Sequence, residues 1–259
     1  MTCMHAPSNE YLSPGFIPMA HRGGALLPQN LGIENTLRAF RNAVELEFQY
    51  LETDVHATRD GKLIAFHDND FSRMADIASS PTQMTFDQVR EIRIGGTEQI
   101  PTLDELLEEF PEQRFNIDIK EHSATPLLVE ALKRHAAHDR VCVGSFSSAR
   151  ITKFRKMLPH VPTSAAPMSA GLLPMGIART RGDVFQIPIR HKVLGVTLEL
   201  ITPKTVQAIH QAGKKVHVWT INDELTMHRL IEWGVDGIIT DRPDLLKTVM
   251  RMRGMWSTQ

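Results

Sequence analysis

Short apolar runs alternate with helix-forming patterns along nearly the whole chain of 259 residues. Most neighbouring runs are separated by a helical pattern, and a repeated strand-then-helix order implies parallel strands. Eight such units in a chain of this length predict an α/β fold of the (β/α)8 TIM barrel type, as a single domain over residues 1–259. The expected strands are residues 16–20, 50–55, 114–119, 141–145, 162–166, 184–189, 215–219 and 237–240.

Two of the helical patterns have clear end signals. Residues 34–48 place apolar side chains on one face, with Asn35 or Thr36 as the candidate N-cap. Residues 202–213 begin with Thr-Pro and end at Gly213, which are residue types favoured at the start and just past the end of a helix. Both segments are predicted to be helices that pack against the strands.

Composition narrows the class of protein. Hydrophobic residues make up 42% and charged residues 23%, so a sizeable core is expected, and the net charge of −1 argues against a nucleic-acid partner. No apolar run approaches the roughly 18 residues of a membrane span. The first residues lack a basic or apolar leader pattern, and Cys3 and Cys142 form no disulfide framework, so a cytoplasmic location is expected. No feature sets an oligomeric state.

The stretch YLETDVHATRDGKLIAFHD, residues 50–68, interrupts the alternation with a predicted β-hairpin. Asp60-Gly61 is a strong signal for a two-residue hairpin loop. With that loop, Asp54 would lie directly opposite His67 on one side of the sheet. Residues from about 68 to 100 then show no clear strand–helix period apart from a short helical stretch at 85–94, and they are predicted to form an insertion at the top face of the barrel.

Polar side chains gather where the predicted strands end, and in a barrel these ends converge on one site. Three carboxylates at about 4 Å repel each other by roughly 4 kcal/mol per pair at an effective dielectric near 20, so protons or a cation must offset them. An all-oxygen ligand set favours Mg²⁺, Ca²⁺ or Mn²⁺ over zinc. The residues at the strand ends are His21, Arg22, Glu52, Asp54, Asp118, Lys120 and Trp219, and the hairpin adds His67.

The motifs HRGG, ENT, LETDV, HD, NIDIK, SF, VHVWTIND and DGIITDRPD, in this order along the chain, resemble the glycerophosphodiester phosphodiesterase family from Ala20 to about Leu246. The resemblance implies a metal-dependent hydrolase that releases sn-glycerol 3-phosphate and an alcohol from a small glycerophosphodiester. It implies that His21 and His67 are the acid–base pair. It further implies metal ligands Glu52, Asp54 and Asp118, phosphate contacts Arg22 and Lys120, a supporting Glu34, and Trp219 in the alcohol pocket.

This chain departs from the family pattern at two places. Asp118 stands where members often carry Glu, and the interval from His21 to Glu34 is longer than is common. Three alternatives remain. A lysophospholipase D would need an apolar groove or a membrane-facing surface, and no basic amphipathic helix supplies one. A non-catalytic phosphodiester-binding barrel should have lost a histidine or a ligand. A sugar-phosphate isomerase or aldolase has no need of paired histidines.

Overall fold

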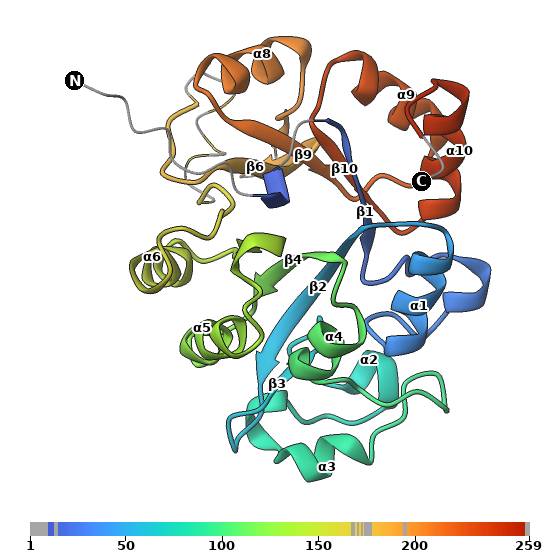
Figure 1. Ribbon diagram of the computed structural model, residues 1–259, viewed down its shortest axis with the longest axis vertical. Helices are drawn as coiled ribbons and strands as arrows, with labels where there is room; N and C mark the ends of the chain where they lie inside the picture. Colours follow the sequence, from blue (N-terminus) through green and yellow to red (C-terminus); the bar gives the residue numbers. More distant parts are fainter. Residues whose placement is uncertain are drawn as a thin grey trace.

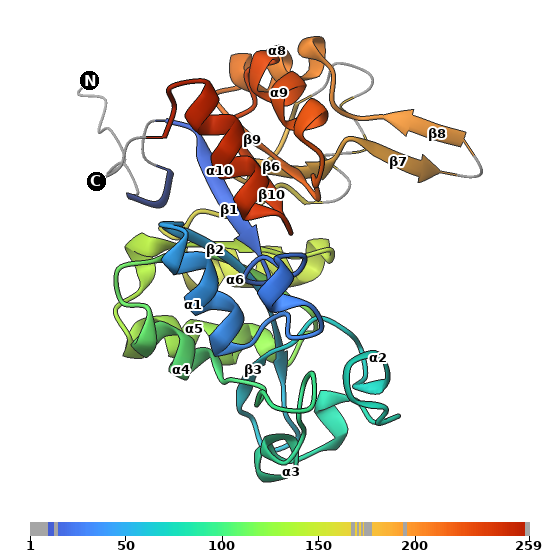
Figure 2. The ribbon, with the colours of Figure 1, turned by 90° about the vertical axis from the view of Figure 1, so that its right-hand side faces the viewer.

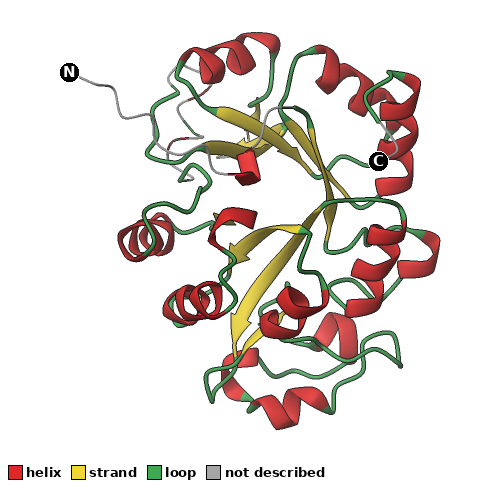
Figure 3. Cartoon of the chain, in the orientation of Figure 1, coloured by secondary structure: helices red, strands yellow, loops and turns green. Residues whose placement is uncertain are grey.

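Parallel strands form the centre of the molecule and helices surround them (Figures 1 and 3). The structure, a computed structural model, describes residues 10–12, 15–166, 169, 171, 173, 178–193 and 196–256. The predicted α/β barrel is confirmed. In the described residues no helix is both long and apolar enough to cross a membrane.

The barrel wall has seven parallel strands in the order β5-β4-β2-β1-β10-β9-β6. The eighth predicted strand, at 162–166, is reduced to two bridges: Thr163 pairs with Val143 and Ser164 with Val184. These bridges link β5 to β6 through Thr163 and Ser164 and nearly close the ring. The strands are β1 (Ile17–His21), β2 (Tyr50–Ala57), β4 (Arg114–Ile119), β5 (Val141–Gly144), β6 (Val184–Pro188), β9 (Lys215–Trp219) and β10 (Gly237–Thr240).

The outer helices bury their apolar faces against the strands in one large core. Thr36 caps the first predicted helix by accepting a hydrogen bond from the backbone N–H of Ala39. The second predicted helix is capped by Thr202, and Gly213 follows its last turn with a φ of +68°. The helices are α1 (Leu37–Glu45), α4 (Leu103–Glu109), α5 (Ala124–Arg134), α6 (Ser148–Met157), α8 (Pro203–Gln211), α9 (Glu224–Glu232) and α10 (Pro243–Met252), with 3-10 turns at Glu10–Leu12, Pro28–Asn30, Pro81–Gln83 and His138–Arg140.

The predicted hairpin exists, but its register was wrong by one residue. β3 (Leu63–Ala65) pairs with β2 so that Val55 faces Ala65, and the Phe66 N–H donates to the Asp54 carbonyl. The loop has three residues because the Thr58 N–H bonds to the Lys62 carbonyl, with Gly61 at a φ of +81°. A three-residue loop with glycine in the left-handed region is the second common hairpin type. His67 therefore lies beyond the paired strands.

The segment predicted as an insertion has a small core of its own. It contains α2 (Ser72–Ala75) and α3 (Phe86–Arg90), which lie below the barrel in Figure 1. Its buried side chains pack against β3 rather than against the main core, and the rings of Phe66 and Phe71 are in contact at a tilt of 50°, with 4.7 Å between their centroids. The insertion is thus anchored to the hairpin that precedes His67.

A second hairpin was not predicted. β7 (Arg190–Val193) pairs antiparallel with β8 (Val196–Glu199), directly after β6, and projects away from the barrel in Figure 2. The β-branched residues Val193, Val196 and Thr197 were the sequence signal for these strands.

Apolar side chains fill the barrel between its strands. Tyr11 packs edge-to-face against Tyr50, whose hydroxyl donates to the Tyr11 carbonyl at 2.8 Å. Met19 and Cys142 belong to the same buried cluster, as expected for a cysteine that acts as a small apolar side chain. Cys3 lies outside the described residues.

His217 on β9 is fully buried, and neither ring nitrogen has a hydrogen-bond partner in the part of the chain that the structure describes. Its ring packs against the position of Gly237 on β10, where a Cβ atom would meet it at 2.9 Å. Burial lowers the pKa of His217 to about 4, because the charged form would lose its hydration.

We predict that His217 makes the fold acid-sensitive. Its pKa is lowered in the folded state, so between about pH 6.5 and 4 the unfolded chain binds a proton that the folded chain does not. This should lower the free energy of unfolding by about 3 kcal/mol as the pH falls through that window. Urea unfolding gives the free energy of unfolding at pH 7 and at pH 4. The difference between these two values should be smaller for His217→Leu than for the wild type. The exposed His122, changed to Leu, is the control, and parallel pH curves for wild type and His217→Leu would contradict the assignment.

Candidate active site

The carboxyl ends of the strands surround a pocket of about 500 Å³. Eight of the nine predicted site residues line it, and the ninth, Glu34, contacts one of them from behind. The eight are His21, Arg22, Glu52, Asp54, His67, Asp118, Lys120 and Trp219. The barrel thus brings together side chains that are nearly 200 residues apart in the chain.

His21, the last residue of β1, is held by a carboxylate. Its Nδ1 lies 2.6 Å from Asp241 Oδ1, and Asn222 in turn donates to the other Asp241 oxygen at 2.9 Å. A carboxylate only accepts, so Nδ1 carries the proton and Nε2 lies 3.7 Å from Glu52 Oε2. Burial by itself would lower the pKa of His21, but Glu52 and Asp241 outweigh it and the pKa is raised.

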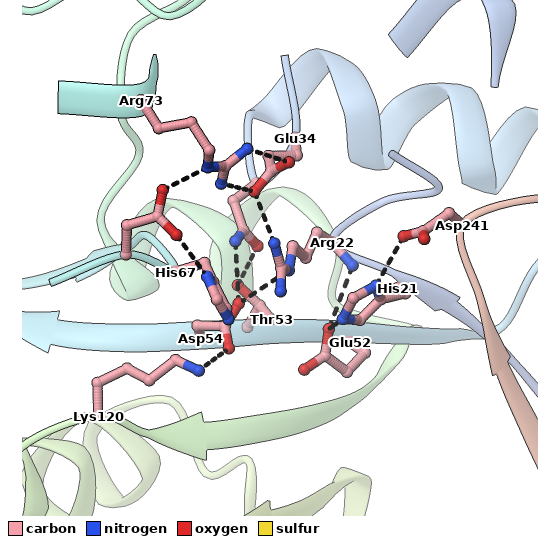
Figure 4. Close-up of polar contacts among 12 residues, drawn as sticks. His21, Arg22, Glu34, Glu52, Thr53, Asp54, His67, Arg73, Lys120 and Asp241 are labelled. Carbon is pink, nitrogen blue, oxygen red and sulfur yellow. Dashed lines mark hydrogen bonds and ion pairs between the residues drawn. The ribbon is translucent and has the colours of Figure 1, made fainter. Parts of the chain in front are cut away.

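His67 is held in the same way by its neighbour. Its Nδ1 lies 2.7 Å from Asp68 Oδ1, which leaves Nε2 for proton exchange. Burial lowers the pKa of His67, and the positive charge of Lys120 lowers it further. The Asp54 carboxylate acts in the opposite direction but does not cancel the shift. In Figure 4 His21 and His67 lie on either side of the Arg22 guanidinium.

The three carboxylates share one face of two neighbouring strands. Glu52 and Asp54 are two residues apart on β2, and Asp54 is directly opposite Asp118 on β4. Burial and the adjacent Asp54 raise the pKa of Glu52 to about 7. Burial also raises the pKa of Asp118, whereas Lys120 and Arg22 overcome burial at Asp54 and lower its pKa. The cluster has more carboxylates than nearby cations.

Lys120 and Arg22 supply the positive charge. Lys120 Nζ lies 2.7 Å from Asp54 Oδ1 and 3.0 Å from Asp118 Oδ2, so it bridges the two strands. Arg22 Nε lies 3.5 Å from Asp54 Oδ2. Among the described residues, no three His, Cys, Asp or Glu side chains are arranged so that they could hold a metal ion in these conformations.

Glu34 reaches the site despite the long interval that separates it from His21. Its Oε1 accepts a hydrogen bond from Arg22 Nη1 at 2.8 Å. The next residue, Asn35, has a φ of +59° and links Thr53 to Asp54, accepting from the Thr53 hydroxyl at 2.9 Å and donating to Asp54 Oδ2 at 3.2 Å. The ENT segment therefore supports β2 and Arg22 together.

One side of the pocket is apolar. Trp219 and Phe146 meet edge-to-face at 5.6 Å between ring centroids, and Lys120 Nζ lies 5.7 Å from the Phe146 ring. The wall continues through Ile187, Pro188, Leu198 and Leu200, on and around β6 and the β7–β8 hairpin.

Sequence reasoning assigned no role to several residues that the structure places at the site. Asp241 directly follows a predicted strand, so the strand-end rule that found Glu52 could have found it. Asp68 and Asn35 adjoin predicted site residues. Arg73, which contacts Asp68 and Glu34, lies in the insertion, where no periodic pattern pointed to a site.

The chain is similar to known proteins over nearly its whole length. The family model described as "Glycerophosphoryl diester phosphodiesterase family" matches residues 21–245. A Mycobacterium tuberculosis protein named probable glycerophosphodiester phosphodiesterase 2 is 39% identical over 97% of each chain. The glycerophosphodiester phosphodiesterase of Caldanaerobacter subterraneus is 29% identical over 91% of this chain and 98% of its own.

Solved structures show the same fold. An Oleispira antarctica phosphodiesterase, in complex with the product sn-glycerol-3-phosphate, superposes with a TM-score of 0.77 at 22% identity, over 92% of this chain and 97% of that one. A glycerophosphodiester phosphodiesterase from Agrobacterium tumefaciens gives a TM-score of 0.73 at 21% identity, over 89% and 99%.

The class is therefore that of phosphodiester-cleaving enzymes built on a parallel barrel. The chain belongs to the glycerophosphoryl diester phosphodiesterase family, and it is an enzyme.

We predict that Asp241→Asn lowers kcat by at least about 10-fold, with a smaller effect on KM, because an amide would no longer fix the His21 tautomer. Steady-state kinetics with a glycerophosphodiester measures this. Asp244→Asn is the matched control, since Asp244 pairs with Arg242 instead of a pocket histidine. A normal kcat for Asp241→Asn would show that Asp241 does not orient the histidine.

Proposed function

We propose that this enzyme hydrolyses glycerophosphodiesters to sn-glycerol 3-phosphate and an alcohol, with a divalent cation and a two-histidine acid–base pair. The observation that carries the proposal is the pair of pocket histidines, each with Nδ1 on a carboxylate, on either side of Arg22. One histidine would remove a proton from the nucleophile, and the other would protonate the oxygen of the leaving alcohol, steps worth about 10²–10⁴ each in rate. The nucleophile is either water, which gives sn-glycerol 3-phosphate directly, or the glycerol 2-hydroxyl, which gives a cyclic phosphate that water then opens.

The chemistry of the carboxylate cluster supports a hard cation, which would displace Lys120 from its contacts with Asp54 and Asp118. Glu52, Asp54 and Asp118 lie on one face of adjacent strands, and the raised pKa of Glu52 reflects a buried carboxylate that lacks sufficient positive charge. These three residues would hold Mg²⁺, Ca²⁺ or Mn²⁺, as oxygen donors suit such ions. The cation would supply charge stabilisation at the phosphoryl oxygens.

Arg22 and Lys120 would bind the phosphate. Both are largely buried at the pocket, and both approach Asp54, so their positive charges lie next to the carboxylates. Preorganised cations of this kind stabilise the charge that develops on the phosphoryl oxygens in the transition state. Trp219 would line the alcohol pocket with its flat apolar face.

A lysophospholipase D is the second candidate, and one observation favours it. The apolar wall from Phe146 to Leu200 could take an acyl chain, which supplies the groove that the sequence alone did not indicate. Two rodent relatives at 27% identity are named lysophospholipase D.

The proposal also includes a cytoplasmic location for this chain.

A coupled assay for released glycerol 3-phosphate, run on glycerophosphocholine, glycerophosphoethanolamine and glycerophosphoglycerol, tests the function. Lysophosphatidylcholine, with release of choline as the readout, tests the second candidate in parallel. Turnover of the lysolipid alone would overturn the proposed preference for small diesters.

We predict that a chelator abolishes this activity and that Mg²⁺, Ca²⁺ or Mn²⁺ restores it, because three buried carboxylates face the pocket. The measurement is activity after dialysis against EDTA, followed by titration with each ion. Glu105→Gln is a control for the chelator series, since Glu105 caps α4 away from the pocket. Full activity in excess EDTA would remove the cation from the mechanism.

We predict that His21→Ala and His67→Ala each lower kcat by about 10²-fold or more while the circular dichroism spectrum is unchanged, since each removes a proton-transfer group. His122→Ala, at an exposed position outside the pocket, should turn over normally. If either pocket variant kept wild-type turnover, that histidine would have a structural role instead.

A further inference from the structure

Arg73 lies in the insertion yet contacts two carboxylates that hold pocket residues (Figure 4). Its Nε donates to Asp68 Oδ2 at 2.6 Å. Its Nη2 and Nη1 donate to Glu34 Oε1 and Oε2 at 2.6 and 3.1 Å. All three guanidinium nitrogens are therefore engaged, in the planar fork that suits two carboxylates at once.

The first arm of this fork leads to a histidine. Asp68 uses Oδ2 for Arg73 and Oδ1 for His67 Nδ1, so the carboxylate is held from both ends. Rotation of Asp68 would break one of the two contacts. The orientation of His67 in the pocket thus depends on a carboxylate that Arg73 keeps in place.

The second arm leads to the phosphate-binding arginine. Glu34 Oε1 accepts from both Arg73 Nη2 and Arg22 Nη1, at 2.6 and 2.8 Å. Two guanidinium groups would repel each other without the carboxylate between them. Glu34 and Arg73 together therefore restrict where the Arg22 side chain can point.

The insertion core sets the position of Arg73 itself. The preceding Phe71 is fully buried and its N–H donates to the Ser79 carbonyl, while the Ser72 N–H bonds to Asp70 at 2.9 Å. The short helix α2 therefore begins at a fixed place, although the Arg73 side chain is 49% exposed. The small core of residues near β3 is connected in this way to the pocket.

We propose that Arg73 is a positioning residue that aligns His67 through Asp68 and Arg22 through Glu34, so that the insertion holds the proton-transfer group and the phosphate-binding group in one geometry. This inference rests on the proposed function, since it assigns Arg73 a role in that reaction. A lysine could not replace it, because one ammonium cannot span both carboxylates in the same planar fork.

The experiment compares Arg73→Ala and Arg73→Lys with the wild type in the glycerol 3-phosphate assay. Arg73→Ala should lower kcat by about 10-fold through the Asp68 arm and raise KM by about 10-fold through the Glu34 arm. Asp68→Asn should mainly lower kcat, and Glu34→Gln should mainly raise KM. The matched control is Arg41→Ala, because Arg41 forms a similar two-nitrogen pair with Glu109 on the surface, at 2.5 and 2.9 Å.

Two further readouts separate positioning from simple loss of stability. In the Asp68→Asn/Glu34→Gln background, Arg73→Ala should change kcat/KM by less than about 3-fold, because its two contacts are already weakened. Added guanidinium should partly restore Arg73→Ala and leave Arg41→Ala unchanged.

Wild-type kcat and KM in a folded Arg73→Ala protein would overturn the inference and leave the proposed function intact. If Arg73→Ala does not fold, Arg73→Lys decides: unchanged kcat and KM overturn the inference, and a combined loss supports it. A wild-type enzyme inactive on every glycerophosphodiester would instead overturn the proposed function.

Discussion

The pairing of β2 with β4 is the constraint on which the rest of the site depends. It places Asp54 opposite Asp118 in a buried position, with Glu52 two residues away on the same face. Buried carboxylates are costly without nearby positive charge. Lys120, which follows β4, lies between the two strands and offsets part of that cost.

The remaining positive charge comes from loops. Arg22 follows β1 with a φ of +52°, and its backbone N–H donates to the Glu52 carbonyl at 3.0 Å and to Glu52 Oε2 at 3.2 Å. Glu34 and Arg73 lie behind it and connect the β1–α1 loop to the insertion. The strands thus position the carboxylates, while loop residues orient the groups that surround them.

Sequence reasoning reached most of the fold because strand and helix periods are local. The end signals at Thr36 and Gly213 were confirmed since a cap depends on a few neighbouring residues. The hairpin register was wrong because Asp60-Gly61 fits both a two-residue and a three-residue loop. The strand at 162–166 was reduced to two bridges, and the β7–β8 hairpin was not foreseen.

The sequence by itself determined the barrel class and which residues lie at the strand ends. Both follow from the alternation of strand and helix patterns along the chain, which can be read without the tertiary structure. The tertiary structure decided the partners of those residues. Asp241 meets His21 across 220 positions, and Arg73 meets Glu34 across 39. Such pairings depend on barrel closure and on the packing of the insertion, which bring distant segments into hydrogen-bond distance and leave no periodic trace in the sequence.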